Sequence, residues 1–322
     1  MKPEGYVPEQ CVWELTRQCN MRCVHCRSNS GIAREDELTI DECLDVAAQL
    51  IDLGNLKTTF TGGEVFLFPG WERIARRMSD NGVAVNIITN GYMFGDRQVE
   101  QIKEAGLVNV AISLNGMREN HDKTKNVDSA FQKVLRAFAR LKEEHIPIAV
   151  ITSLMDCNVS DLESMYRLLV EYGINSWRLR IAPPMGNTRE HKYMLLDPAH
   201  VPMITEFIRQ KQADGRLSIF AGENKSAWSG CRAGLTAVGI DSAGNVRGCE
   251  SLKGHGFIEG NLRRETLRDI WTKEGNFNYN RRSEPSQLKG KICRGGCRGA
   301  CHFNSQRMFE NRYCDYRPRI EA

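Results

Sequence analysis

Short apolar runs alternate with amphipathic stretches along the first two-thirds of the chain. The runs have the length and the β-branched or aromatic content of buried strands. They are Cys11–Thr16, Thr58–Thr61, Val83–Thr89, Val108–Leu114, Ile148–Leu154 and Trp177–Ile181. Between them, apolar residues recur at helical spacing, as they do from Ala130 to Leu141. This alternation predicts a parallel sheet in which each crossover is made by a helix.

Two of the predicted helices have recognisable ends. Thr39-Ile40-Asp41-Glu42 has the form of a capping box, which predicts a helix that begins there and ends at Gly54. Ser160-Asp161-Leu162-Glu163 has the same form and predicts a second helix that ends near Gly173.

The pattern changes beyond about residue 222. Strand-like runs become short, over Ala237–Asp241 and Val246–Cys249, and one further helix is predicted over Leu262–Lys273. The tail after this helix is rich in loops and cysteines. We therefore expect three parts, namely a lead-in over 1–10, a core domain over 11–222 and a small cysteine-rich domain over 223–322. Ligands of parallel sheets bind beyond the carboxyl ends of the strands, so polar segments that follow strands are site candidates.

Composition narrows the class of protein. The 322 residues are 41% hydrophobic and 26% charged, which excludes a disordered or collagen-like chain. The net charge of +4 gives no support for a nucleic-acid-binding protein. No apolar run approaches the roughly 18 residues that span a bilayer, and the polar N-terminus MKPEGYVPEQ is not a secretory signal. We expect a cytoplasmic protein with neither nucleic acid nor membrane as its partner.

The 12 cysteines indicate metal ligands or redox groups, because a chain of this size without a secretory signal has little use for disulfides. Three of them, Cys19, Cys23 and Cys26, follow the first strand with the spacing C-x3-C-x2-C. If this loop folds back on itself, three thiolates can hold three irons of a [4Fe–4S] cluster and leave the fourth iron open. A zinc site with His25 as fourth ligand is the alternative, although its position between two cysteines gives poor geometry for one ion.

This triplet resembles that of radical S-adenosylmethionine (SAM) enzymes, and three further segments match that family in order. Thr61-Gly62-Gly63-Glu64 stands where the family has its GGE motif. Thr89-Asn90-Gly91 follows the third strand, and Ser113-Leu114-Asn115-Gly116 follows the fourth. Two departures are Val65-Phe66-Leu67 after the GGE motif and Asn115 where many relatives have Asp.

The resemblance implies a partial (β/α)6 barrel, similar to a TIM barrel, with a [4Fe–4S] cluster on the cysteine triplet. It implies that SAM chelates the open iron. An electron from a flavodoxin- or ferredoxin-type reductant then yields a 5′-deoxyadenosyl radical, which abstracts a hydrogen atom from the substrate. Glycines permit close approach of the backbone to a ligand, and a carboxylate can accept from an ammonium group. The residues implied to bind SAM are Gly62, Gly63, Glu64, Asn90, Ser113, Asn115 and Arg178.

Six further cysteines lie in the C-terminal part, at Cys231, Cys249, Cys293, Cys297, Cys301 and Cys314. All of them except Cys301, which is an extra cysteine, resemble together with Gly244 the SPASM or shorter twitch extension of radical SAM enzymes. That extension holds one or two auxiliary [4Fe–4S] clusters. Where the full pattern has another cysteine pair, this chain has Glu284 and Gln287. Six cysteines cannot saturate two clusters, so the tail holds either one complete cluster or two with open or non-cysteine ligation. A structural zinc site remains the alternative.

Two residues are candidates for catalysis. Glu250 follows Cys249, where sulfatase-maturing relatives have an Asp that takes the substrate proton, so it is a candidate base; a solvated surface Glu is the alternative. Cys157 follows the fifth strand at the ligand end of the sheet and is a candidate hydrogen-atom donor.

The resemblance specifies the enzyme class better than the substrate. We expect hydrogen abstraction from a peptide or protein, giving a crosslink, an epimer or an oxidised residue, with the auxiliary clusters anchoring substrate or accepting an electron. A dehydrogenase or epimerase for small sugar- or cyclitol-like molecules is the second interpretation. A non-enzymatic iron–sulfur carrier or zinc protein is the third, and it leaves the open three-cysteine loop and the GGE turn unexplained.

Overall fold

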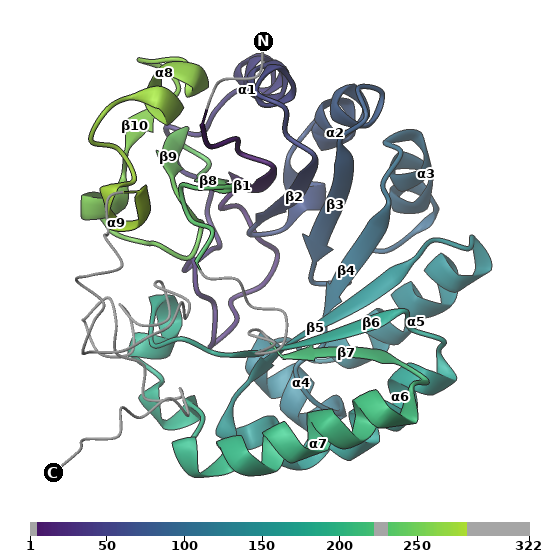
Figure 1. Ribbon diagram of the computed structural model, residues 1–322. Helices are drawn as coiled ribbons and strands as arrows, with labels where there is room; N and C mark the ends of the chain where they lie inside the picture. Colours follow the sequence, from purple (N-terminus) through teal and green to yellow (C-terminus); the bar gives the residue numbers. More distant parts are fainter. Residues whose placement is uncertain (1–4, 222–230, 282–322) are drawn as a thin grey trace, which may run out of the picture.

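The fold is a mostly parallel α/β sheet with helices along its outer side (Figure 1). The computed structural model describes residues 5–221 and 231–281. The sheet has ten strands in the order β10-β9-β8-β1-β2-β3-β4-β5-β6-β7. Their bounds are β1 Gln10–Thr16, β2 Lys57–Gly62, β3 Ala84–Thr89, β4 Asn109–Ser113, β5 Ile148–Leu154, β6 Ser176–Ile181, β7 Ser218–Ala221, β8 Ala237–Ile240, β9 Asn245–Arg247 and β10 Gly260–Asn261.

Nine α-helices and six short 3-10 helices connect these strands within the described ranges. The α-helices are α1 Ile40–Asp52, α2 Trp71–Ser79, α3 Asp96–Glu104, α4 Arg118–Lys125, α5 Ala130–Glu143, α6 Leu162–Glu171, α7 Val201–Asp214, α8 Leu267–Thr272 and α9 Asn278–Arg281. The 3-10 helices are η1 Val65–Leu67, η2 Asp156–Asp161, η3 Gly186–Arg189, η4 Lys192–Met194, η5 Pro198–His200 and η6 His255–Phe257. No helix in this part of the chain is long and apolar enough to cross a membrane.

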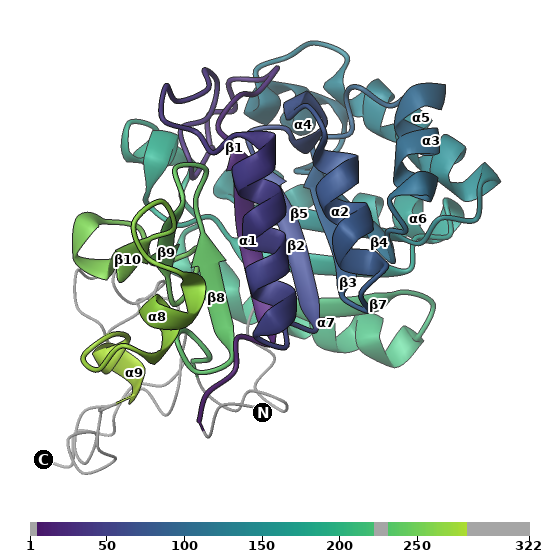
Figure 2. The ribbon, with the colours of Figure 1, turned by 90° about the horizontal axis from the view of Figure 1, so that it is seen from above.

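All six strands predicted from the apolar runs are present, and β1 to β6 pair in parallel with their neighbours. β7 was not predicted; it is a short strand that pairs in parallel with β6. β8 pairs in parallel with the other side of β1, so the C-terminal segment continues the same sheet. Figure 2 shows α1 lying along β1 and β2, with α8 beside it.

The capping box at Thr39 is confirmed: the Thr39 hydroxyl accepts from the Glu42 amide, and the Glu42 carboxylate accepts from the Thr39 amide. The second predicted box is wrong. α6 begins at Leu162, directly after the 3-10 helix η2, and Asp161 gives it no side-chain cap. The carboxylate of Asp161 accepts instead from the Met117 amide at 2.8 Å. It therefore fixes the turn after β4, which is a tertiary contact that a local motif does not contain.

The helix predicted over Leu262–Lys273 is shorter than expected. α8 begins only after Thr266, whose hydroxyl accepts from the Asp269 amide at 3.1 Å and caps the first turn. The α8 amide of Leu267 donates to Gln49 of α1 at 2.6 Å. Arg263 donates to both carboxylate oxygens of Glu42, at 2.6 and 2.9 Å. These contacts attach the C-terminal segment to the N-terminal turn and outer face of α1.

The register of the strands shows where the segments that follow them lie. Thr16 lies opposite Gly62 at the ends of β1 and β2, Thr89 lies opposite Ile112, and Ser113 lies opposite Ile151. The carboxyl ends of these parallel strands therefore form one edge of the sheet. The segments that the sequence singled out after the first four strands all leave the sheet at this edge.

Candidate functional site

The cysteine triplet lies on a loop that leaves β1 and folds back on itself. The Gly31 amide donates to the Arg17 carbonyl at 2.8 Å, and the Cys19 amide donates to the Gly31 carbonyl at 3.1 Å. These two bonds pin the start and end of the loop together. We call residues 17–31 the cysteine loop.

Backbone amides face two of the thiols in this loop. The Met21 amide donates to the sulfur of Cys19 at 3.4 Å, and the Ser30 amide donates to that of Cys26 at 3.3 Å. Burial, with a smaller contribution from the neighbouring Cys23 and Cys26, raises the pKa of Cys19 to about 11. Amides aimed at sulfur stabilise thiolates, so three thiols on one loop, two of them with such donors, suit an iron–sulfur cluster that would take the place of their protons.

Gly62 and Gly63 are required because the end of β1 and the start of the cysteine loop pass directly over them. A Cβ on Gly62 would lie 2.4 Å from the Thr16 carbonyl oxygen, and one on Gly63 would lie 2.1 Å from that of Gln18. The Gly63 amide donates to the Thr16 carbonyl at 2.7 Å. The glycines thus give close approach of backbone to backbone, whereas the sequence suggested approach to a ligand. They fix the position from which the cysteine loop starts.

Glu64 is fully buried and bonded inside the protein. Its carboxylate accepts from the Thr89 hydroxyl at 2.8 Å and from the Asn90 amide at 2.9 Å. Burial raises the pKa of this carboxyl, and the two bonds oppose that shift. The GGE turn after β2 is in this way joined to the turn after β3. The Asn90 side chain then donates to Asn20 of the cysteine loop at 2.7 Å, so Asn90 lies beside Cys19.

Asn115, after β4, connects the cysteine loop to β5. Its side-chain amide lies 2.9 Å from Nε2 of His25, and its side-chain oxygen accepts from the Ser153 amide at 2.9 Å. Burial lowers the pKa of His25 to about 3, so the ring is neutral. Since Nε2 accepts from Asn115, Nδ1 carries the proton, and neither ring nitrogen is then a free metal ligand. This pairing argues against the zinc site with His25. Ser113 lies half-buried at the end of β4.

Lys125 is a residue that the sequence did not single out. It ends α4, is only 3% exposed, and its positive charge acts on Cys23, His25 and Glu64. A buried cation near Cys23 favours the ionised form of that thiol. Nothing in the local sequence marks this lysine, because only the fold brings α4 to the cysteine loop.

Cys157 lies in η2, and its thiol pKa is raised by burial. It packs with Val24 of the cysteine loop on a small apolar group made of Met155, Ala182 and Met194. The protonated thiol keeps the S–H bond that a hydrogen-atom donor needs. Arg178 and Arg180 alternate with the buried Trp177 and Leu179 along β6, so they lie on the opposite face from those residues.

Glu250 is 4% exposed and forms ion pairs with Arg27 and Lys253. Arg27 also donates to the Ser251 hydroxyl at 3.0 Å. Lys253 reaches Glu14 of β1 at 3.1 Å, and burial lowers its pKa. Glu250 is therefore not a solvated surface residue. It lies in a chain of alternating charges between the cysteine loop and the loop after Cys249.

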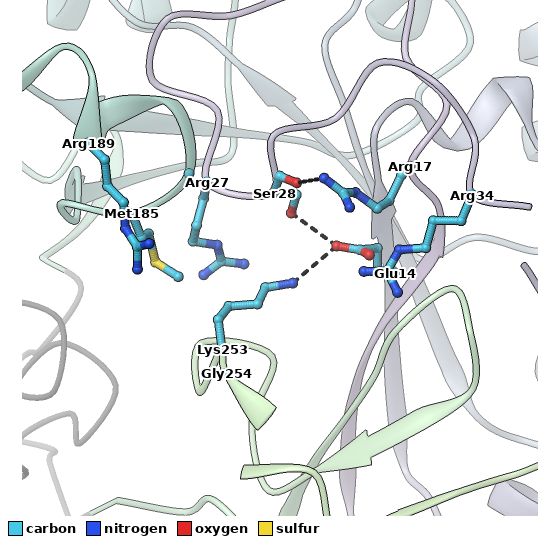
Figure 3. A pocket seen from close by; sticks show the side chains of 10 residues that line it. Glu14, Arg17, Arg27, Ser28, Arg34, Met185, Arg189, Lys253 and Gly254 are labelled. Carbon is cyan, nitrogen blue, oxygen red and sulfur yellow. Dashed lines mark hydrogen bonds and ion pairs between the residues drawn. The ribbon is translucent and has the colours of Figure 1, made fainter. Parts of the chain in front are cut away.

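A cavity of about 220 Å³ opens beside this charge chain (Figure 3). We call it the cation pocket, because five cationic side chains and one carboxylate line it. Its lining residues are Glu14, Arg17, Arg27, Ser28, Arg34, Met185, Gly186, Arg189, Lys253 and Gly254. Figure 3 shows Arg189 and Arg27 on one side, Glu14 and Arg34 on the other, and Lys253 between them.

Two of the predicted auxiliary cysteines, Cys231 and Cys249, lie in the described part of the chain. Burial chiefly raises the pKa of the Tyr279 hydroxyl, and both cysteines contribute electrostatically to that rise. The Ser251 amide donates to the sulfur of Cys249 at 3.4 Å, and Asn280 donates to the Cys231 carbonyl at 2.8 Å. The structure thus brings these two cysteines to one tyrosine. Cys293, Cys297, Cys301 and Cys314 lie outside the described residues.

Comparisons with known proteins agree with this arrangement. Residues 13–169 match the model of the Radical SAM superfamily, and residues 231–301 match that of SPASM, an iron–sulfur cluster-binding domain. An AdoMet-dependent heme synthase of Methanosarcina barkeri is 26% identical over 346 aligned positions, covering 97% of each chain. The sporulation killing factor maturation protein SkfB of Bacillus subtilis is 27% identical over 253 positions, covering 77% of this chain and 61% of SkfB.

Solved structures share the fold. Streptococcus suis SuiB bound to SAM superimposes with a TM-score of 0.76 at 16% identity, over 91% of this chain and 74% of SuiB. The protein anSMEcpe, with AdoMet and a peptide bound, gives 0.75 at 18% identity, over 95% and 93% of the two chains. The two matched domains imply a SAM-binding [4Fe–4S] cluster and auxiliary iron–sulfur clusters. With a radical SAM domain followed by a SPASM domain, this chain belongs to the radical SAM enzymes.

Proposed function

We propose that this chain is a radical SAM enzyme that modifies a peptide or protein. The observation that carries the proposal is the cation pocket, which lies between the cysteine loop and the loop after Cys249. Its volume of about 220 Å³ is below the roughly 300–1,000 Å³ of pockets that enclose drug-sized ligands. A space of this size suits one amino-acid side chain rather than a whole macrocycle.

Relatives support the same substrate class. SkfB is named as a maturation protein, and SuiB has been crystallised with its precursor peptide SuiA. The fold shared with SuiB and anSMEcpe can therefore receive a peptide.

In the proposed reaction, Cys19, Cys23 and Cys26 hold the SAM-binding cluster. When bound, the cluster and SAM supply an electron and the adenosyl radical that abstracts a hydrogen atom. The turns after β2, β3 and β4, together with β6, are proposed to contact SAM. The residues concerned are Gly62, Gly63, Glu64, Asn90, Ser113, Asn115 and Arg178. Glu64 and Asn115 act mainly by holding these turns against the cysteine loop, since their side chains bond protein groups.

The C-terminal cysteines Cys231, Cys249, Cys293, Cys297, Cys301 and Cys314 are proposed to hold the auxiliary iron–sulfur sites. Glu250 is proposed to take the substrate proton from its place beside Cys249, and Cys157 to return a hydrogen atom. A flavodoxin- or ferredoxin-type protein is the proposed electron donor. Because Glu250 is paired with Arg27 and Lys253, it can act as a base only after substrate displaces one of these cations.

A second candidate is the oxidation of a tetrapyrrole. The heme synthase of M. barkeri aligns over 97% of each chain, whereas the alignment with SkfB leaves part of SkfB unmatched. A carboxylate side chain on a tetrapyrrole would also be attracted to the cation pocket.

The test is deuterium transfer. The anaerobically reconstituted enzyme is incubated with SAM, dithionite and fully deuterated short peptides encoded next to its gene, or with deuterated iron-coproporphyrin III. The proposal predicts deuterium in 5′-deoxyadenosine and a changed mass of a peptide. Deuterium transfer from the iron porphyrin alone would contradict it and establish the second candidate.

A further inference from the structure

Among the described residues, one cation of the cation pocket has no hydrogen-bond or ion-pair partner. Arg27 and Lys253 are paired with Glu250, and Arg34 lies 3.7 Å from Asp241. Arg17 donates to the carbonyls of Ser28 and Asn29, at 2.6 and 2.8 Å. Within residues 5–221 and 231–281, Arg189 alone among the five makes neither a hydrogen bond nor an ion pair.

The backbone holds Arg189 at the pocket. Arg189 ends η3, which is bonded to the cysteine loop: the Asn187 amide donates to the Cys26 carbonyl at 3.0 Å, and its side chain donates to the Cys23 carbonyl at 2.9 Å. A Cβ on Gly186 would lie 2.2 Å from the Cys26 carbonyl oxygen, so the contact is close. The position of Arg189 is therefore set by the cysteine loop, next to the cluster ligands.

The opposite side of the pocket has an unused acceptor. Glu14 is 1% exposed. Its Oε2 accepts from Ser28 at 3.0 Å and from Lys253 at 3.1 Å, whereas Oε1 has no hydrogen-bond partner in the described part of the chain. A buried carboxylate oxygen without a donor is costly, so a ligand that brings an N–H to it is favoured.

We propose that the cation pocket binds an acidic residue of the peptide substrate, with its carboxylate on Arg189 and a backbone N–H on Glu14. Arg189 and Glu14 face the cavity from opposite sides (Figure 3). An Asp or Glu residue carries an anion and an amide N–H separated by a few bonds, which matches a cation and an acceptor across a space of about 220 Å³. A tetrapyrrole propionate supplies the anion but no N–H beside it.

This site would hold one substrate residue next to the cysteine loop. Arg189 is an exposed residue, and a charge-assisted bond to its guanidinium would distinguish an acid from its neutral amide by about tenfold. The inference rests on the proposed peptide function, and it adds the requirement that an acidic residue lies close to the residue that is modified.

The experiment uses the anaerobic holoenzyme with SAM and isothermal titration calorimetry. Three probes are compared: N-acetyl-L-glutamate N-methylamide, the corresponding L-glutamine compound, and glutarate, which has carboxylates but no N–H. We expect the glutamate probe to bind about tenfold more tightly than the glutamine probe. Equal affinity of the two would overturn the proposal.

Two variants and a control locate the contacts. Arg189→Gln should reduce the preference for the glutamate probe to less than about twofold. Glu14→Gln, which can place an NH2 group where Oε1 would accept the ligand N–H, should weaken binding of the glutamate probe and leave binding of glutarate unchanged. Arg216→Gln, at an exposed arginine paired with Asp214, should change neither the preference for the glutamate probe nor its affinity. Unchanged preference in Arg189→Gln overturns the carboxylate contact, and an unchanged glutamate probe in Glu14→Gln overturns the N–H contact.

Iron content and reductive SAM cleavage are measured on each variant, so that a role confined to the clusters is recognised. Loss of iron together with an unaltered preference of the remaining holoenzyme would assign Arg189 to the cluster and overturn the pocket. The two proposals fail separately. Binding of the glutamate probe through Arg189, without modification of any peptide, would support the acidic-residue site and contradict the peptide function. A modified peptide without binding of the glutamate probe would support the peptide function and contradict the acidic-residue site.

Discussion

Arg27 and Glu250 form an ion pair between the residue that follows Cys26 and the residue that follows Cys249. Glu250 is 4% exposed, and 223 positions separate the two residues in sequence. The pair therefore connects the cysteine loop directly to the loop that follows Cys249. Substrate bound in the cation pocket would lie against both loops at once.

Breaking this pair should destabilise the protein. In Arg27→Gln the buried Glu250 keeps only Lys253, and removal of one partner of a buried pair costs about 3–5 kcal/mol. The measurement is the thermal unfolding midpoint of the anaerobic protein. Removing both charges in Arg27→Gln/Glu250→Gln should cost less than the sum of the single variants. Additive effects would show that the two side chains do not act as a pair.

Glu250→Gln should cleave SAM at the rate of the unaltered enzyme but form less product. The cluster ligands are untouched, whereas the carboxylate that would take the substrate proton is lost. Both 5′-deoxyadenosine and product are quantified in one reaction. An unchanged ratio of product to 5′-deoxyadenosine would exclude Glu250 as the base.

Gly63→Ala should abolish SAM cleavage and lower stability. The new Cβ would lie 2.1 Å from the Gln18 carbonyl oxygen, so the start of the cysteine loop must move. Gly256→Ala is the matched control, because no atom lies within 4 Å of its Cβ position. We expect SAM cleavage and iron content to fall in the first variant only. Full activity of Gly63→Ala would show that the loop tolerates displacement.

The contact between Glu42 and Arg263 should make stability depend on pH. Hydrogen bonds from Arg263 lower the pKa of Glu42 from its ordinary value near 4.5 to about 2. A depressed carboxyl pKa contributes stability that is full above pH 4.5 and is lost as the pH falls toward 2. Glu42→Gln should therefore lower the unfolding midpoint most at pH 6–7 and least near pH 2. A loss that is the same at both pH values would contradict this assignment.

The strands and the capping box at Thr39 could be predicted because they depend on local pattern. Apolar runs specify buried strands wherever both faces of a sheet are covered, and the Thr39 bonds lie within four residues. The box at Ser160 failed because Asp161 bonds a residue 44 positions away. β7 was missed because it is only four residues long and follows α7 closely.

The cysteine spacing predicted a loop that folds back on itself, and the structure shows such a loop. The contacts around this loop could not be predicted from the sequence. The partners of Arg27, Lys253 and Glu14 come from distant segments that only the folded sheet brings together. Lys125 and Arg189 carry no local signal for the same reason.

The decisive measurement is iron and acid-labile sulfide per chain, made on the anaerobically reconstituted protein and on Cys19→Ala/Cys23→Ala/Cys26→Ala. We expect the triple variant to lose about four irons and all SAM cleavage. We also expect the iron of the C-terminal domain to remain, about four atoms for one auxiliary cluster or about eight for two. A triple variant that binds no iron would contradict the auxiliary sites. One that keeps its full iron content would contradict the cluster on the cysteine loop.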